Sequence, residues 1–194
     1  MNSHVYHNQL PIGVFDSGIG GLTVLASLTK QLPNESFIYL GDTARLPYGT
    51  KSPETVAKYT QQVAELLFQY GIKLLVVACN TATACGFSIL QATHPFLPVI
   101  GVIEPGAQKA CELSTRGHIG VLCTEATAQN GAYEKTILKI NPDAKVIQKS
   151  CGLFVSLVEE GFSTGLIARE VVSHYLSPLL NPKEEFQLDC LVLG

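Results

Sequence analysis

The sequence has 194 residues, of which 46% are hydrophobic and 15% charged, with a formal net charge of −3. Typical globular domains carry about 25% charged residues, so this chain can bury a large core, and its composition excludes a disordered polymer. The mildly acidic balance, without a lysine or arginine cluster, argues against a nucleic-acid binder. Residues 74–79 form the longest apolar run, far short of the ~20 residues of a membrane span. The polar start of the chain predicts no signal peptide.

Seven short apolar runs predict strands, and helix-length segments separate them. The expected strands are residues 10–15, 37–40, 73–78, 99–102, 118–122, 144–148 and 188–193. Near-continuous Val, Ile and Leu runs are typical of parallel strands that are covered on both faces. The alternation predicts an α/β fold, built either as one sheet or as two lobes that meet near residues 98–105.

The clearest helix covers residues 54–70. Ser52 suits the N-cap, Pro53 the first turn, and Gly71 the end of the helix. Its apolar stripe predicts one buried face made of Val56, Tyr59, Val63, Leu66, Leu67 and Tyr70.

The loops that follow the strands carry the candidate chemistry, because ligands of open α/β sheets bind beyond the carboxyl ends of the strands. Residues 16–21, 41–49, 79–83 and 123–127 are rich in glycines, hydroxyls and amides. Neutral donors at helix starts suit a small carboxylate ligand. The glycine loop lacks the third glycine of the dinucleotide fingerprint, and Asp16 would repel a pyrophosphate. The alternative is a plain strand-to-helix turn with Ser17 as its cap.

Cys79 is the sharpest single signal, since it ends an apolar strand and opens a helix. Backbone N–H groups and the helix dipole favour a thiolate there, whereas a buried structural cysteine is the alternative. Cys85, two turns further on, is expected in the core. No histidine follows a strand end, which disfavours a hydrolase, but a thiolate that acts as a base needs no histidine.

Two segments, 79–83 and 123–127, both read C-x-x-A-T after an apolar strand. This repeated pattern could arise by chance or from a relationship between two lobes. Counting strands gives a different equivalence, which places Thr124 near the position of Asp16.

Five motifs, in order along the whole chain, resemble those of glutamate racemases. They are residues 12–22 (IGVFDSGIGGL), 42–52 (DTARLPYGTKS), 77–83 (VACNTAT), 98–106 (PVIGVIEPG) and 153–161 (LFVSLVEEG). The resemblance implies two α/β lobes, 1–98 and 99–194, each a mainly parallel sheet flanked by helices, with the active site in the cleft between them. It implies cofactor-free racemisation of L- and D-glutamate by two cysteines on opposite faces of the α-carbon, supplying D-glutamate for peptidoglycan.

The resemblance also implies roles for individual residues. Cys79 would deprotonate D-glutamate, Asp16 would assist it or hold the ammonium group, and Glu159 would be the acid of the second lobe. The substrate-binding residues would be Asp16, Ser17, Tyr48, Gly49, Asn80, Thr81, Thr124 and Thr127. We expect glutamate as substrate, no metal or cofactor, no nucleic-acid or membrane partner, a cytoplasmic location and a homodimer.

The chain departs from the family pattern in several places. Gly152 and Ser156 stand where the family has proline, and Cys123 stands where glycine is usual. The family's Gly-Cys-Thr-His motif, which carries the second cysteine, would begin at Gly194. We therefore expect a chain that ends before its second base and is inactive as a racemase. The alternatives are a racemase of aspartate or another amino acid in the same family, and a non-catalytic α/β domain that binds a small ligand.

Overall fold

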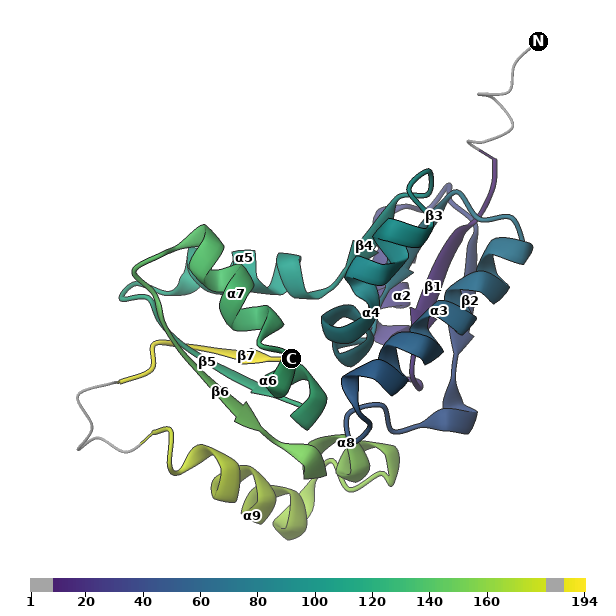
Figure 1. The fold of residues 1–194 in the computed structure, drawn as a ribbon. Helices are drawn as coiled ribbons and strands as arrows, with labels where there is room; N and C mark the ends of the chain where they lie inside the picture. The colour runs from purple at the N-terminus through teal and green to yellow at the C-terminus, as the bar shows by residue number, and fades with distance from the viewer. Residues whose placement is uncertain (1–8, 181–186) are drawn as a thin grey trace. The chain divides into compact units, whose positions relative to one another are not determined.

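The computed structural model describes residues 9–180 and 187–194 (Figure 1). The chain divides into two compact units, Met1–Val102 and Ile103–Gly194. Each unit contains a parallel sheet with helices beside it, which confirms the expected α/β class. All seven expected strands are present, with ends within two residues of the predicted ones. No helix in the described part of the chain is long and apolar enough to cross a bilayer.

The first unit has four strands in the order β2-β1-β3-β4. These are β1 (Ile12–Asp16), β2 (Phe37–Gly41), β3 (Leu74–Val77) and β4 (Val99–Gly101). Strand β4 lies after the division expected at residue 98, yet it pairs with β3 in the first sheet. The first unit therefore extends to Val102.

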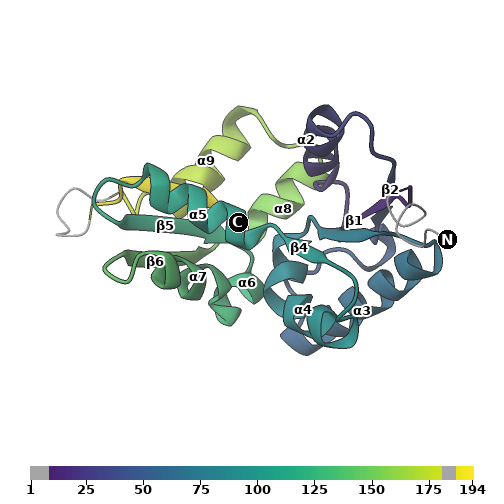
Figure 2. The same cartoon turned by 90° about the horizontal axis from the view of Figure 1, so that it is seen from above.

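Side chains alternate between the two faces of this sheet, and each face has its own core. Phe15 and Val77 pack with α3 (Pro53–Gln69) and α4 (Asn80–Thr93). Val14 and Val76 pack with α2 (Leu22–Gln31) on the other face. Figure 2 shows α3 and α4 on one side of the strands of this unit and α2 on the opposite side. Burial on both faces explains why the strands read as continuous apolar runs.

Helix α3 begins and ends as the sequence predicts. Ser52 accepts a hydrogen bond from the Thr55 N–H at 3.3 Å, Pro53 occupies the first turn, and Gly71 adopts a φ of +72°. That positive φ suits glycine because it has no Cβ.

The buried face of α3 is rotated from the predicted stripe. Leu66 is 43% exposed and Tyr70 is 64% exposed, so their predicted burial was wrong. The helix instead buries small residues beside its larger ones: Val56, Ala57, Thr60, Val63, Ala64 and Leu67. This face lets α4 approach closely, since Gly86 of α4 lies against Thr60.

The second unit has three strands in the order β6-β5-β7. Its elements are α5 (Ile103–Leu113), β5 (His118–Cys123), α6 (Glu125–Asn130), α7 (Ala132–Ile140), β6 (Lys145–Ser150), α8 (Gly152–Glu159), α9 (Gly165–Leu176) and β7 (Cys190–Leu193). Ile119 and Val121 of β5 are fully buried, as is Ile137 of α7. Figure 1 shows α7 and α9 on opposite sides of β5 and β6. Cys190 is half-buried, on the edge strand β7.

The two sheets repeat one arrangement, in which the first strand lies between the second and the third. Asp16 ends β1, and its carbonyl accepts from the Asp42 N–H at 2.9 Å. Cys123 ends β5, and its carbonyl accepts from the Cys151 N–H at 2.8 Å. Cys123 is therefore the structural counterpart of Asp16, and Thr124 is the counterpart of Ser17. The equivalence obtained by counting strands holds to within one residue.

The third strands obey the same correspondence. The Phe15 carbonyl accepts from the Ala78 N–H at 2.7 Å, and the Leu122 carbonyl accepts from the Gly194 N–H at 2.7 Å. Gly194 thus matches Ala78, the residue before Cys79.

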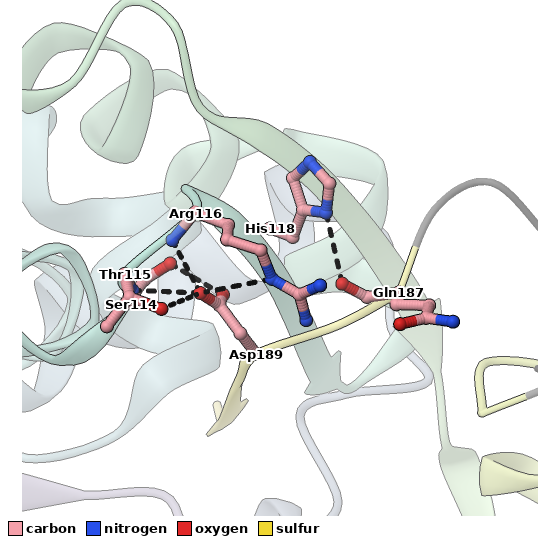
Figure 3. A network of polar contacts seen from close by, with 6 residues as sticks. All are labelled: Ser114, Thr115, Arg116, His118, Gln187 and Asp189. Atoms are coloured by element: carbon pink, nitrogen blue, oxygen red, sulfur yellow. Dashed lines mark hydrogen bonds and ion pairs between the residues drawn. The ribbon is translucent and has the colours of Figure 1, made fainter.

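A carboxylate fixes the start of β7 (Figure 3). Asp189 accepts from the Ser114 hydroxyl at 2.7 Å, from the Thr115 N–H at 2.8 Å and from the Arg116 N–H at 2.6 Å. These donors belong to the loop between α5 and β5, so Asp189 ties β7 to the beginning of its neighbouring strand. Burial opposes ionisation of Asp189, but this set of donors holds its pKa well below the usual range.

Candidate functional site

The candidate site of the first unit forms at the carboxyl ends of β1 and β3. These strands are parallel neighbours, with Phe15 opposite Val77. The residues that follow them therefore come together although they are far apart in sequence. The Cys79 thiol donates to the Ser17 hydroxyl oxygen at 3.3 Å.

Asp16 is held rigidly by the turn that follows it. Its Oδ2 accepts from the Gly21 N–H at 2.8 Å and from the Gly18 N–H at 3.2 Å, and the Tyr39 hydroxyl lies 3.5 Å away. A Cβ at Gly21 would lie 2.6 Å from the Asp16 Cβ, so this contact requires glycine. The glycine loop thus holds a buried carboxylate in place. This differs from the alternative, a plain strand-to-helix turn capped by Ser17.

Cys79 is the N-cap residue of α4, and its sulfur accepts from the Ala82 N–H at 3.3 Å. Thr83, one turn into the helix, donates to the Cys79 carbonyl at 2.8 Å and to the Val77 carbonyl at 3.1 Å. The strand end and the helix start are therefore joined by one side chain. Sequence reasoning missed this role of Thr83, for which its place in the first turn of the helix was the one available signal.

Burial sets the protonation state of Cys79. The side chain is 6% exposed. Burial raises the pKa of the Cys79 thiol, and the Asp16 charge raises it further. The hydrogen bond with the Ser17 side chain and the backbone N–H groups of Ala82 and Ser17 lower this pKa, but the net direction is upward. The donors at the helix start act as expected, but desolvation outweighs them. The resting form is the thiol rather than the thiolate.

A second polar cluster lies behind the site, in the loop after β2. The Tyr48 hydroxyl donates to Asp42 Oδ2, and Arg45 Nε lies 2.6 Å from the same oxygen. The Arg45 guanidinium also stacks over the Tyr59 ring of α3, 4.3 Å from its centroid. Sequence reasoning missed Asp42, although its place directly after a strand, like that of Asp16, was an available signal.

Tyr48 does not present its side chain to a ligand in this structure. The residue is 1% exposed, and its ring packs against Phe15 and Tyr59. Burial, together with the hydrogen bond to Asp42, raises the Tyr48 pKa far above its ordinary value, so the phenol stays neutral. Any contact of Tyr48 with a substrate must therefore use its backbone, as must contacts of the buried Gly49.

The two other first-unit residues expected to bind substrate lie beside the sulfur. Asn80 and Thr81 form the first turn of α4; Asn80 is half-buried and Thr81 is buried. Helix N-termini present backbone N–H groups to anions. The structure thus brings Asp16, Ser17 and Cys79 together with this helix start.

The remaining expected residues belong to the second unit. Thr124 caps α6, with its Oγ1 3.4 Å from the Thr127 nitrogen and 3.0 Å from the Thr127 hydroxyl. Glu159 is the last residue of α8 and is exposed. Burial raises the pKa of Cys123 to about 11, and the neighbouring Cys151 contributes. Over residues 9–180 and 187–194, no group of three or more His, Cys, Asp or Glu side chains is placed to hold a metal ion.

Comparison with known proteins points to one family. The model of the Asp/Glu/Hydantoin racemase family matches residues 12–193. Glutamate racemase of Geobacter metallireducens is 52% identical over 183 residues, which are 94% of this chain and 66% of that protein. Glutamate racemase of Chlorobium phaeobacteroides is 41% identical over 194 residues, 100% of this chain and 70% of that protein. The chain thus spans about two thirds of the length of these relatives.

Solved structures agree with this comparison. A crystal structure of the Francisella tularensis glutamate racemase in complex with D-glutamate matches with a TM-score of 0.89 and 43% identity, covering 96% of this chain and 68% of that one. The Bacillus anthracis glutamate racemase isoform matches with a TM-score of 0.90 and 41% identity, covering 97% and 69%. An aspartate racemase of Picrophilus torridus shares the fold, with a TM-score of 0.59 at 16% identity and coverage of 93% and 79%.

Proposed function

Because this chain belongs to the Asp/Glu/Hydantoin racemase family, we propose that it acts on glutamate and interconverts its L and D forms by cofactor-independent transfer of the α-proton. The observation that carries the proposal is the arrangement around Cys79. A single ionisable sulfur lies at a helix start, beside a fixed carboxylate and a hydroxyl.

The chemistry needs a base on one face of the α-carbon and an acid on the other. In this proposal Cys79, as thiolate, removes the α-proton of D-glutamate and becomes a thiol. The α-proton is weakly acidic, so the carbanionic transition state needs donors in a site that excludes water. The first turn of α4, with Asn80 and Thr81, supplies N–H donors for a carboxylate. The backbone of Tyr48 and Gly49 contributes further substrate contacts.

Asp16 is the proposed partner of the substrate ammonium group. Two backbone N–H groups hold its carboxylate in place, so it offers a preorganised negative charge without reorganising. Its charge also opposes ionisation of Cys79. A bound ammonium group would offset that charge, so substrate binding would itself favour the thiolate. Thr124 and Thr127 are proposed as substrate contacts of the second unit, and Glu159 as its acid.

We further propose that the product, D-glutamate, is used for peptidoglycan synthesis in the cytoplasm, and that the protein forms a homodimer. The relatives named above are glutamate racemases, which supports glutamate as the substrate. The oligomeric state is tested by experiment. Sedimentation velocity measures the assembly directly, and a monomer at micromolar concentration would contradict the dimer.

The experiment that tests the proposal follows the α-proton. D-Glutamate is incubated with the protein in D₂O, and loss of the α-proton signal is recorded by NMR. Cys79→Ser should slow the exchange by about 10²-fold or more, because it removes the proton acceptor. Cys85→Ser, a change on the same helix, is the matched control and should leave the exchange rate within a few-fold of wild type.

The same assay separates the alternatives. Faster exchange with D-aspartate than with D-glutamate would indicate an aspartate racemase. Binding of glutamate without any Cys79-dependent exchange would indicate a non-catalytic ligand-binding domain.

A further inference from the structure

Ser17 contacts the Cys79 sulfur through its side chain. Its hydroxyl oxygen lies 3.3 Å from Sγ, and its backbone N–H lowers the pKa of the thiol. The Ala82 N–H, 3.3 Å away, approaches from α4. The sulfur is therefore hydrogen-bonded to one backbone donor and to one side-chain hydroxyl.

These groups differ in what they can do when the sulfur changes its charge. A backbone N–H only donates, so it favours the thiolate alone. A serine hydroxyl both accepts and donates. In the resting thiol, S–H donates to the Ser17 oxygen. After deprotonation the hydroxyl can rotate and donate to the sulfur, and the two heavy atoms need not move.

We propose that Ser17 is a positioning residue that stays hydrogen-bonded to Cys79 Sγ in both protonation states, reversing the direction of the bond when the thiol ionises. A base that alternates between thiolate and thiol during turnover keeps its place only if its partner serves both forms. This role rests on the proposed function of Cys79 as a proton acceptor, and it is additional to any contact of Ser17 with substrate.

Other titratable groups face the sulfur and must be considered together. Asp16, the last residue of β1, opposes ionisation of the sulfur. Tyr48, from the loop after β2, and Cys85, from α4, also interact with it. Burial holds the pKa of Cys85 near 11 and that of Tyr48 higher still, so both are neutral at physiological pH. Ser17 is thus the side-chain donor to the sulfur that a single substitution removes.

The test measures the rate at which iodoacetamide alkylates Cys79 as a function of pH. Trypsin cuts after Lys73 and Lys109, so Cys79 and Cys85 share a peptide, and fragment-ion mass spectrometry separates them. Ser17→Ala should move the midpoint of the Cys79 profile upward by about one pH unit, which is tenfold less thiolate at a fixed pH below it. Greater access to the sulfur would scale the whole profile but leave its midpoint in place.

Three further variants make the result decisive. Ser17→Gly also lacks the hydroxyl and should repeat the shift, so the test survives misfolding of one variant. Ser17→Thr keeps the hydroxyl and should restore the wild-type midpoint. Ser27→Ala removes an exposed serine of α2 and should change nothing.

An unchanged midpoint in the folded Ala and Gly variants would overturn the proposal. A Ser17→Thr variant whose midpoint is shifted like those of the Ala and Gly variants would also overturn it. Alkylation needs no turnover, so these outcomes do not depend on whether the chain racemises glutamate, which the α-proton experiment tests separately.

Discussion

Asp42 holds the loop that carries Tyr48 and Gly49, although it is not itself a proposed substrate contact. Asp42→Ala would leave the buried Tyr48 hydroxyl and the Arg45 guanidinium without their shared acceptor. Loss of a charged hydrogen-bond partner costs about 1–3 kcal/mol, so we expect a loss of that size in the free energy of unfolding by urea. Tyr48→Phe, which leaves the Asp42–Arg45 pair intact, should cost about 1 kcal/mol.

An exposed ion pair provides the control for this prediction. Lys109 and Glu112 are also three residues apart, with Nζ and Oε2 3.0 Å from each other, but both side chains are more than half exposed. Exposed pairs contribute about 0–1 kcal/mol. Glu112→Ala should therefore change stability by less than Asp42→Ala does, and equal effects would refute the anchoring role.

At the scale of single residues, the sequence predicted positions better than environments. The meeting of Asp16, Ser17 and Cys79 follows from strand ends in a parallel sheet, so it could be predicted. The protonation state of Cys79 could not, because burial competes with the helix start and only the packed structure gives the balance. The role of Asp42 depends on side-chain directions within one loop, which no local pattern specifies.

Helix α4 approaches α3 closely because Gly86 lacks a side chain. A Cβ at Gly86 would lie 2.6 Å from Thr60 Cγ2 and 2.7 Å from Thr60 Cβ, so rotation of Thr60 cannot relieve the clash. Gly86→Ala should gain about 1 kcal/mol in helix propensity but lose about 1–3 kcal/mol to overpacking. We expect a net loss of stability, read as a lower urea midpoint.

Gly152, at the start of α8, is the matched control for Gly86→Ala. Nothing lies within 4 Å of a Cβ built at this position. Gly152→Ala should therefore be neutral or stabilise by up to about 1 kcal/mol. A stabilised Gly86→Ala variant would show that the two helices can separate freely.

Strand β7 depends on Asp189, and this dependence should vary with pH. The pKa of Asp189 is lower in the folded chain than its unfolded value of about 3.9. The carboxylate therefore stabilises the fold above about pH 4, and this contribution is lost as the pH falls through the folded pKa. Asp189→Asn should lower the free energy of unfolding by about 2 kcal/mol at neutral pH.

The difference in unfolding free energy between Asp189→Asn and wild type should narrow below about pH 4. In this range the unfolded wild-type chain takes up a proton that the folded Asp189 carboxylate still resists. Urea unfolding at pH 7 and pH 3 measures both values. If this difference in unfolding free energy stays constant between pH 7 and pH 3, the charge of Asp189 does not contribute to stability, and only the shape of its side chain matters.

At the scale of elements, apolar periodicity was sufficient to locate all seven strands. It failed to give the buried face of α3, because Leu66 and Tyr70 match the apolar pattern but the packed partner meets Ala57, Thr60 and Ala64 instead. Small residues are weak indicators of a buried helix face in a sequence, although close packing of two helices favours them.

Both sheets repeat one three-strand arrangement, and the repeat assigns a place to Cys79 and to Cys123. Cys79 follows the third strand of the first sheet, after Ala78. In the second sheet the matching position follows Gly194, since Gly194 and Ala78 make the same backbone hydrogen bond. Cys123 matches Asp16 instead. Cys123 therefore occupies the position of Asp16 rather than that of Cys79, the proposed base.

This placement leads to a prediction for Cys123. Loss of a positioned acid or base costs about 10²–10⁴-fold in rate. Exchange of the α-proton of D-glutamate in D₂O is followed by NMR, and formation of L-glutamate by chiral chromatography. Cys123→Ser should leave the exchange rate unchanged, because Cys123 lies where the repeat places Asp16. Inversion as fast as exchange, lost in Cys123→Ser but not in Cys151→Ser, would instead make Cys123 the second base and break the equivalence between the two sheets.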